Sequence, residues 1–333
     1  MAQRNPNTCV AVVTGAGGHL GGNLVRGLIA AGHTVRAVDI RKTPALDGLD
    51  VDWRQADLRD AGAIRSALTG ADVVYHLAAV ISIAGDPSGR VWSTNVDGVG
   101  TVAEAALRCR LRRMVHCSSV HAFDIELSGG ALDESSPRSV RPRLPVYDRS
   151  KAAGEERLQE WIARGLDAVI INPTGLIGPY DFEPSRMGSF FLALRRRKLG
   201  AVVDGAFDWV DVRDVAAALM AASARGRAGE SYLVAGHRVS LVGLGRLAAL
   251  VTGAAGPRVV VPMPVARFGA RALAAVRSSG EPSRLLTAEG LHALKCCPVV
   301  VSRKAELELG HNARPAETTV TDLYRWFELA GYA

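Results

Sequence analysis

The sequence predicts an α/β protein of the Rossmann type: a doubly wound parallel sheet with a small, mostly helical lobe toward the C-terminus. The first half of the 333 residues alternates short β-branched runs with longer stretches of helical period, which is the pattern of right-handed βαβ units. The expected strands are nearly continuous apolar runs, which indicates a sheet covered on both faces. A glycine-rich turn at residues 14–21 separates the first such run from the first helical stretch.

Each expected element follows from its local pattern. The strands are rich in β-branched and aromatic residues, and we expect them at 9–14, 34–40, 51–55, 72–77, 113–118 and 168–172, with one more at 231–235. The helices place apolar residues on one face, and we expect them at 18–31, 60–69, 96–108 and 146–164. The first helix carries Leu20, Leu24 and Leu28 on one face and ends at Gly32.

The alternation weakens after residue 180, where helical stretches, Gly/Pro breaks and isolated strands follow. We therefore expect residues 1–180 to form the sheet domain and 206–237 to return to it. The remaining residues, 181–205 and 238–333, would form the smaller lobe. A chain of this length is sufficient for such an arrangement.

Composition excludes several classes of protein. A hydrophobic content of 48% with 22% charged residues argues against wholesale disorder. No window has the roughly 18 consecutive apolar residues of a membrane span, and the N-terminus does not have the pattern of a signal peptide. The five cysteines form no CxxC pair, so neither a disulfide scaffold nor a metal site is expected. This cysteine usage is typical of a reduced, cytoplasmic protein.

The net charge of +7 is mild for 40 basic and 33 acidic residues. Aromatic residues do not alternate with basic ones along the chain, so nucleic-acid binding is not expected. A balance of this kind suits an anionic cofactor or small-molecule substrate better.

The glycine-rich turn reads TGxxGxxG, with Gly15, Gly18 and Gly21 at the marked positions. The first glycine allows a tight turn, the second lets the backbone approach a pyrophosphate, and the third lets the helix pack closely on the strand. The free N–H groups of the helix N-terminus then meet the anion. Because the turn lies between a strand and a helix, the sequence predicts an NAD(P)-binding site. Three more residues of the turn belong to this site: Gly17, His19 and Leu20. His19 is expected to face solvent or the cofactor backbone.

Two acidic positions extend the predicted cofactor site. Asp39, at the end of the second strand, is placed to hydrogen-bond the adenosine ribose and to repel the extra phosphate of NADP, which favours NAD. Arg41 and Lys42 follow directly and could pair with that phosphate, so NADP stays an alternative. Asp57 and Leu58 follow the third strand, where the carboxylate could receive the adenine amino group or cap the next helix.

Tyr147 and Lys151 are four residues apart on an expected helix, which places them on one face. A nearby ammonium favours the phenolate and lowers the pKa of a tyrosine, so Tyr147 could exchange a proton with an alcohol or ketone. The fifth strand ends in Ser118 and Ser119, at the sheet edge where ligands of open α/β sheets bind. A serine hydroxyl there could orient the substrate oxygen.

These motifs together resemble the extended short-chain dehydrogenase/reductases of the NAD-dependent epimerase/dehydratase type. The matching segments occur in family order, and they are TGAGGHLG at 14–21, ADL at 56–58, HLAA at 76–79, NVDG at 95–98, CSSVHAF at 117–123, YDRSK at 147–151, NPTGLIGP at 172–179 and WVDVRDVA at 209–216. They span about two-thirds of the chain.

The resemblance implies roles for individual residues. Tyr147 would be the general acid/base, Lys151 would bind the nicotinamide ribose and tune Tyr147, and Ser119 would donate to the substrate oxygen. Ser119 is preferred to Ser118 because the family carries an aromatic residue four positions after the catalytic serine, here Phe123. The remaining implied residues lie around the cofactor: Leu77, Ala78 and Ala79 along it, Pro173 against the nicotinamide carboxamide, and Asn95 holding the active-site backbone.

The resemblance also implies a homodimer, formed through the helices at 96–108 and 146–164. Three histidines draw attention beside these motifs. His121, two residues after Ser119, is interpreted as a bystander in its loop, with a place in the substrate pocket as the alternative. His76 and His116 lie in buried-strand patterns and are expected to be core residues.

Family dehydratases carry Thr-Asp-Glu where this chain has Ser119-Val120-His121, so dehydration is not expected. Segments 199–203 and 207–214 resemble the dihydroflavonol-reductase and hydroxysteroid-dehydrogenase branch. The sequence therefore predicts an NAD(P)-dependent oxidoreductase that moves a hydride to or from a secondary alcohol or ketone. The alternatives are a sugar-nucleotide epimerase that retains its NAD, and a non-catalytic NAD(P) sensor.

Overall fold

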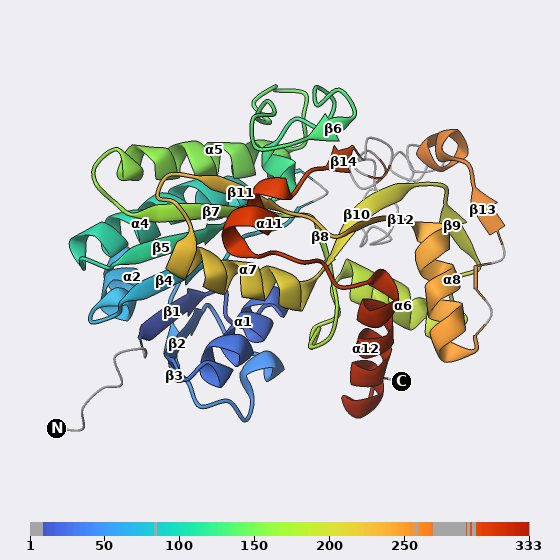
Figure 1. The fold of residues 1–333 in the computed structure, drawn as a ribbon, viewed down its shortest axis with the longest axis horizontal. Helices are drawn as coiled ribbons and strands as arrows, with labels where there is room; N and C mark the ends of the chain where they lie inside the picture. The colour runs from blue at the N-terminus through green and yellow to red at the C-terminus, as the bar shows by residue number, and fades with distance from the viewer. Residues whose placement is uncertain are drawn as a thin grey trace.

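A computed structural model describes residues 9–82, 85–254, 256–257, 259–268, 291, 294 and 298–332. A seven-stranded parallel sheet forms the main body, and a smaller lobe lies beside it (Figure 1). The sheet has the order β11-β7-β5-β4-β1-β2-β3. Its strands are β1 (Val10–Thr14), β2 (Thr34–Asp39), β3 (Asp52–Gln55), β4 (Val73–His76), β5 (Arg113–Cys117), β7 (Ala168–Pro173) and β11 (Ser231–Val234). All seven expected strands are confirmed, each within about one residue at either end.

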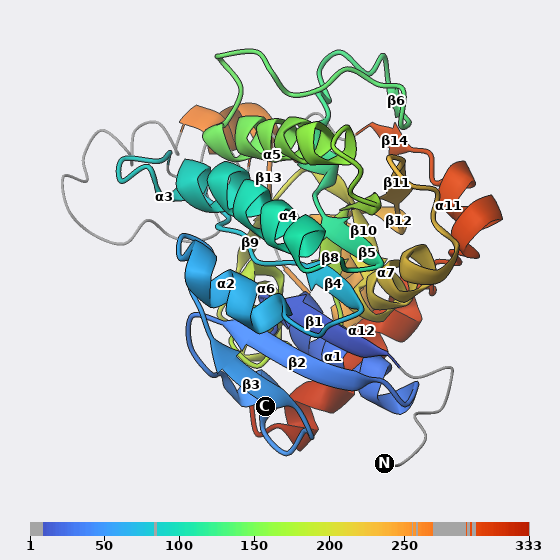
Figure 2. The same cartoon turned by 90° about the vertical axis from the view of Figure 1, so that its left-hand side faces the viewer.

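Helices cover both faces of the sheet, as the apolar strands predict (Figure 2). One layer contains α1 (His19–Ala30), α7 (Val212–Arg225) and α11 (Arg303–Leu309), and the other contains α2 (Ala61–Leu68), α4 (Gly98–Arg108) and α5 (Val146–Ile162). Successive side chains of β1 serve the two layers in turn: Ala11 and Val13 pack under α1, and Val12 packs under α4. The strand period thus builds two hydrophobic cores.

The helix expected at 96–108 extends further toward the N-terminus than its sequence indicates. It is preceded by α3 (Arg90–Trp92) and a π-helical turn, Ser93–Asp97. The Asp86 carboxylate accepts hydrogen bonds from the backbone N–H groups of Val91 and Trp92, both at 3.0 Å, and so satisfies the first turn. Sequence patterns missed this extension because the Ser-Thr-Asn run at 93–95 has low helix propensity.

The lobe combines short strands with aromatic-rich helices. Its three-stranded sheet has the order β12 (His237–Ser240), β10 (Ala206–Asp211), β8 (Gly175–Ile177). Around it lie α6 (Arg186–Arg195), α8 (Leu241–Thr252) and α12 (Ala316–Leu329), and two strand pairs: β9 (Ala201–Val203) with β13 (Val259–Val261), and β6 (Ala131–Leu132) with β14 (Val299–Val300). Phe191, Tyr324 and Phe327 are fully buried in the lobe core.

The expected division into a sheet domain and a lobe stays a prediction, and the structure adds two details to it. β10, at the start of the segment expected to return to the sheet domain, pairs with strands of the lobe. α11 packs through Ala305 and Leu309 into the core of the sheet domain, although its residues were expected in the lobe. Within the described ranges, no helix is long and apolar enough to cross a membrane.

Candidate active site

The candidate site lies at the carboxyl ends of the parallel strands. The strand order reverses between β1 and β4, and such a switch point opens a crevice for a ligand. Most predicted site residues follow the ends of these strands. Gly15 follows β1, Asp39 ends β2, Leu77 follows β4, Ser119 closely follows β5, and Pro173 ends β7.

The glycine turn is fitted closely to its neighbours. Gly15 has a φ of +71°, and a Cβ there would lie 2.7 Å from the backbone nitrogen of Ala78. A Cβ on Gly21 would lie 2.1 Å from the Gly15 carbonyl oxygen. Only glycine fits at these two positions, and α1 begins directly after Gly18. The turn, with Gly17 and Leu20, thus presents backbone N–H groups where a pyrophosphate would bind.

The Asp39 carboxylate faces the glycine turn. Its Oδ2 accepts a hydrogen bond from the Gly17 N–H at 3.0 Å, and its Oδ1 accepts one from the Ile40 N–H at 2.7 Å. Arg41 is turned toward the segment between β8 and α6, since its Nη1 donates to Glu183 Oε1 at 2.6 Å. The arginine that could attract the phosphate of NADP is therefore paired with an acidic side chain, and the carboxylate that suits NAD lies at the turn.

Asp57 and Leu58 follow β3 as expected, but Asp57 does not cap the next helix. That cap is Asp60, whose side chain accepts from the Ala63 N–H at 2.9 Å. Hydrogen bonds from Arg59 lower the pKa of Asp57 to about 2, so this carboxylate is ionised at neutral pH. The Leu58 side chain is buried under α4, where it closely approaches Gly98, so a cofactor would meet the Leu58 backbone.

His19 is half-buried and makes contacts that its sequence position did not indicate. Its Nε2 lies 3.1 Å from the Gly178 carbonyl oxygen and 3.0 Å from that of Pro179. Asn23, one turn later, donates to the same Pro179 oxygen at 3.1 Å. The imidazole therefore joins the start of α1 to the segment after β8. These two segments are far apart in the sequence, so local patterns could not predict their contact.

Ser119, Tyr147 and Lys151 come together at the ends of β5 and α5. The Ser119 Oγ accepts a hydrogen bond from the His121 N–H at 3.2 Å, and the Ser119 side chain is close enough to the Tyr147 phenol to influence its pKa. The surrounding protein raises the pKa of Tyr147 above its usual range by desolvation, and the nearby Ser119 side chain opposes this rise. Lys151 is buried and its Nζ donates to the Cys117 carbonyl oxygen at 3.2 Å. Burial lowers the pKa of Lys151, and the negative charge of Glu155 opposes that shift.

Asn95 connects the loop after β4 with α5. Its Oδ1 accepts from the Val80 N–H at 2.8 Å, and its Nδ2 donates to the Val80 carbonyl and the Ser150 hydroxyl, both at 2.9 Å. A Cβ on Gly154 would lie 2.4 Å from the Asn95 carbonyl oxygen, so α5 packs directly on the π-helical turn. This geometry matches the structural role that the family resemblance implies for Asn95.

The other residues implied to line a cofactor lie along the same edge. The Leu77 N–H donates to the Thr14 carbonyl at 3.1 Å, which continues the pairing of β4 with β1. Ala78 and Ala79 follow, with Ala78 against Gly15. Pro173 is buried at the end of β7. In the described part of the chain, no group of three or more His, Cys, Asp or Glu side chains could hold a metal ion.

His121 lies beside Tyr147, and the bystander interpretation of this histidine stays a prediction. Its Nδ1 lies 3.2 Å from Oδ1 of the buried Asp148. The centroid of its ring lies 5.6 Å from that of Tyr147 in an edge arrangement and 5.9 Å from that of Phe207 in a stacked one. The position of Asp148 directly after Tyr147 could have indicated a pair with a nearby histidine. Phe207, on β10, could not be found from local patterns.

Comparison with known proteins agrees with this site. A model of the NAD dependent epimerase/dehydratase family matches residues 11–235. Sterol demethylase protein B of Methylococcus capsulatus is 39% identical over 253 residues, which cover 75% of this chain and 77% of that protein. A provisional dihydroflavonol 4-reductase of Synechocystis is 30% identical over 327 residues, 96% of this chain and 95% of its own.

Solved structures share the same fold. The crystal structure of a nucleoside-diphosphate-sugar epimerase from Pseudomonas aeruginosa superposes with a TM-score of 0.79 and 25% identity, covering 97% of this chain and 99% of that one. The family match spans the glycine turn, the serine after β5 and the tyrosine and lysine of α5. The chain therefore belongs to the NAD-dependent epimerase/dehydratase family, as an enzyme of the extended short-chain dehydrogenase/reductase type whose cofactor is NAD.

Proposed function

We propose that the enzyme moves a hydride between NAD and a carbon that bears a secondary alcohol or a ketone, with Tyr147 as the general acid/base. The observation that carries this proposal is the placement of Ser119, just after β5, near Tyr147 on α5, one helical turn from the buried Lys151. NAD, when bound, supplies the hydride donor or acceptor at its nicotinamide ring.

The protein residues would handle the proton. Burial keeps the Tyr147 phenol neutral in the protein alone, so it is ready to donate a proton to a carbonyl oxygen in the direction of reduction. Ser119 would donate a second hydrogen bond to the same oxygen. In the direction of oxidation Tyr147 would first release its own proton to solvent, which the Lys151 ammonium and the positive charge of the oxidised cofactor would favour, and the resulting phenolate would accept the alcohol proton.

Aromatic side chains near Tyr147 favour a flat, apolar substrate. His121 stacks on Phe207, and the Phe207 ring lies 5.3 Å from that of Trp209. The two relatives named for a sterol and for a dihydroflavonol support the same class of substrate. The residues after the catalytic serine, Val120 and His121, provide no carboxylate of the kind that dehydration would require.

A screen of sterol, flavonoid and sugar-nucleotide substrates with NAD and NADP tests this proposal. We expect a net change in NADH with a sterol-like or flavonoid-like alcohol or ketone, and loosely bound cofactor in the purified enzyme. The alternative is an epimerase, which the similarity to the Pseudomonas structure favours. Tightly retained NAD, with conversion of a sugar nucleotide and no net NADH, would select that alternative.

We also propose a cytoplasmic homodimer that forms through α4 and α5. The family resemblance supports this assembly, and both helices lie in one layer of the sheet domain. Light scattering coupled to size-exclusion chromatography should give twice the chain mass of 35.2 kDa. A mass of one chain at micromolar concentration would contradict the dimer.

A further inference from the structure

Glu155 continues the line of catalytic residues along α5. Tyr147, Lys151 and Glu155 are spaced four residues apart, so they lie on one face of the helix. Glu155 is 4% exposed, although a carboxylate is seldom buried without a specific partner. The proton transfer described above does not use this side chain, so its burial requires another explanation.

The contacts of Glu155 lead to the catalytic serine. Its Oε1 accepts a hydrogen bond from Asn172 Nδ2 at 2.5 Å, and the same Nδ2 donates to the Ser119 carbonyl oxygen at 3.0 Å. Asn172 is fully buried near the end of β7. Asn172 therefore connects the Glu155 carboxylate on α5 to the backbone of Ser119 through two hydrogen bonds.

Arg138 provides the opposite charge. Its Nη1 lies 3.2 Å from Glu155 Oε2, and its guanidinium lies 3.9 Å above the centre of the Phe123 ring. Arg138 Nη2 also donates to the Ser231 hydroxyl of β11, at 3.4 Å. Glu155 thus joins α5, β7 and the segment around Arg138 behind the active site.

The groups around Lys151 explain why the charge of Glu155 matters. Burial raises the pKa of the Cys117 thiol to about 11, so this thiol is neutral at pH 7 to 9. Burial lowers the pKa of His76 to about 3 and that of His116 well below its usual range, so both imidazoles are also neutral there. Tyr147, on the same helix, stays a phenol. Glu155 then supplies the negative charge that opposes the desolvation of the ammonium.

We propose that Glu155 is a positioning residue of the active site, which fixes the Ser119 backbone through Asn172 and keeps Lys151 charged for the nicotinamide ribose. Two functions are combined in one carboxylate: a hydrogen-bond acceptor toward Asn172 and a negative charge one helical turn from the lysine. The proposal rests on the proposed function only for the role of Lys151 toward the cofactor.

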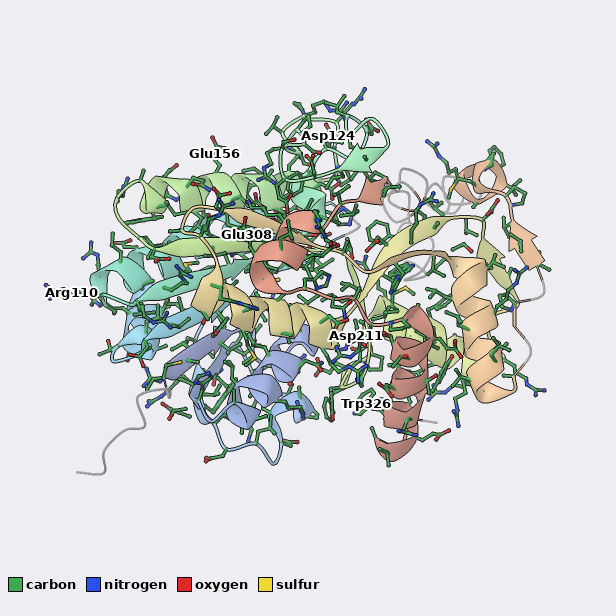
Figure 3. All side chains as sticks on the ribbon, viewed as in Figure 1. Arg110, Asp124, Glu156, Asp211, Glu308 and Trp326 are labelled. Atoms are coloured by element: carbon green, nitrogen blue, oxygen red, sulfur yellow. The ribbon has the colours of Figure 1, made fainter. Side chains whose placement is uncertain are left out.

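Two substitutions separate the effect of the charge of Glu155 from the effect of its side-chain length. Glu155→Gln keeps the length and the acceptor oxygen but removes the charge. Glu155→Asp keeps the charge but is one methylene shorter, so the contact with Asn172 is lost. Glu156→Gln is the matched control, because Glu156 is the next residue of α5 and projects away from the molecule (Figure 3).

The experiment measures the affinity for NADH from about pH 7 to pH 10. The fluorescence of NADH reports binding, so no substrate is needed. Affinity should fall at high pH as Lys151 loses its proton. In Glu155→Gln we expect this fall about one pH unit lower, because removing a neighbouring negative charge disfavours the ammonium. Glu155→Asp and Glu156→Gln should follow the wild-type profile.

An unchanged profile in Glu155→Gln, or an equal shift in Glu156→Gln, would overturn the proposal. Circular dichroism establishes that each variant is folded. Should Glu155→Gln fail to fold, Glu155→Asp still decides, because a shift in its profile would show that the charge is not the cause. Since the assay measures cofactor binding alone, a wrong substrate class would leave its result intact.

Discussion

We expect a single carboxylate at the end of β2 to determine which cofactor the glycine turn favours. Asp39 accepts hydrogen bonds from the Gly17 and Ile40 N–H groups, and its negative charge lies where the extra phosphate of NADP would be. Arg41 cannot offset that charge while it is paired with Glu183. We therefore expect the preference for NAD to depend on Asp39 and on the pairing of Arg41, two positions later in the sequence.

Asp39→Asn should move the preference toward NADP. The amide oxygen can still accept from Gly17, so the turn is kept, but the repulsion of the phosphate is gone. We expect the ratio of the dissociation constants for NADP and NAD to fall about tenfold or more, since a hydrogen bond that involves a charged group contributes about 1.5–3 kcal/mol. Calorimetric titration with both cofactors measures it, with the exposed Asp47→Asn as the control. An unchanged ratio would refute this assignment.

His121 is the residue beside Tyr147 whose position the sequence described least well. Its imidazole lies between Asp148, Tyr147 and Phe207, and its side chain is 23% exposed. The imidazole therefore lies on the same side of the site as the Tyr147 phenol. We therefore expect His121 to contact the substrate and not the cofactor.

His121→Phe tests this contact. The aromatic ring is retained for stacking on Phe207, and the hydrogen-bonding nitrogens are lost. We expect kcat/KM to fall several-fold, because a neutral hydrogen bond contributes about 0.5–1.5 kcal/mol, while the affinity for NADH stays at the wild-type value. Weaker NADH binding with unchanged kcat/KM would place His121 on the cofactor side instead.

At the scale of elements, β4 and β5 carry two buried histidines side by side. The rings of His76 and His116 are stacked with centroids 5.2 Å apart, and their burial confirms the expectation that they are core residues. Burial lowers the pKa of His76 to about 3 and that of His116 well below the usual value. An unfolded chain would protonate both near pH 6.5.

This difference predicts acid sensitivity of the fold. Below about pH 6.5 the unfolded state binds protons that the folded state excludes, so the free energy of unfolding falls as the pH falls toward 3. Each histidine should contribute about 1.4 kcal/mol per pH unit in that range. Urea unfolding measures the slope for the wild type, for His116→Gln and for the exposed control His237→Gln. We expect a smaller slope in His116→Gln alone, and identical slopes in all three would contradict the assignment.

The elements that were predictable from sequence are those whose hydrophobic pattern is local. The strands of the main sheet are continuous apolar runs, and α1 and α5 carry their own periodicity, so both types could be recognised. β8, β10 and β12 are short, and they pair across more than 25 residues of sequence. Their pairing depends on the return of the chain to the lobe, which no local pattern encodes.

At the scale of the whole molecule, the site lies where the sheet domain meets the lobe. The sheet provides the glycine turn, Ser119 and Pro173, and the lobe strand β10 provides Phe207. The motif residues could be predicted because cofactor chemistry requires particular residue types at particular spacings. Asn172 and Arg138 could not, because their roles arise only from packing, although the four-residue spacing from Lys151 could have indicated Glu155.

The measurement that tests the proposed mechanism most directly is the comparison of NADH binding and turnover in Tyr147→Phe. The substitution removes only the phenolic oxygen, so the fold and the cofactor site should persist. We expect wild-type affinity for NADH and a decrease in kcat of about 10² to 10⁴, the usual contribution of a general acid/base. Turnover at the wild-type rate would contradict the assignment of Tyr147 as the proton donor.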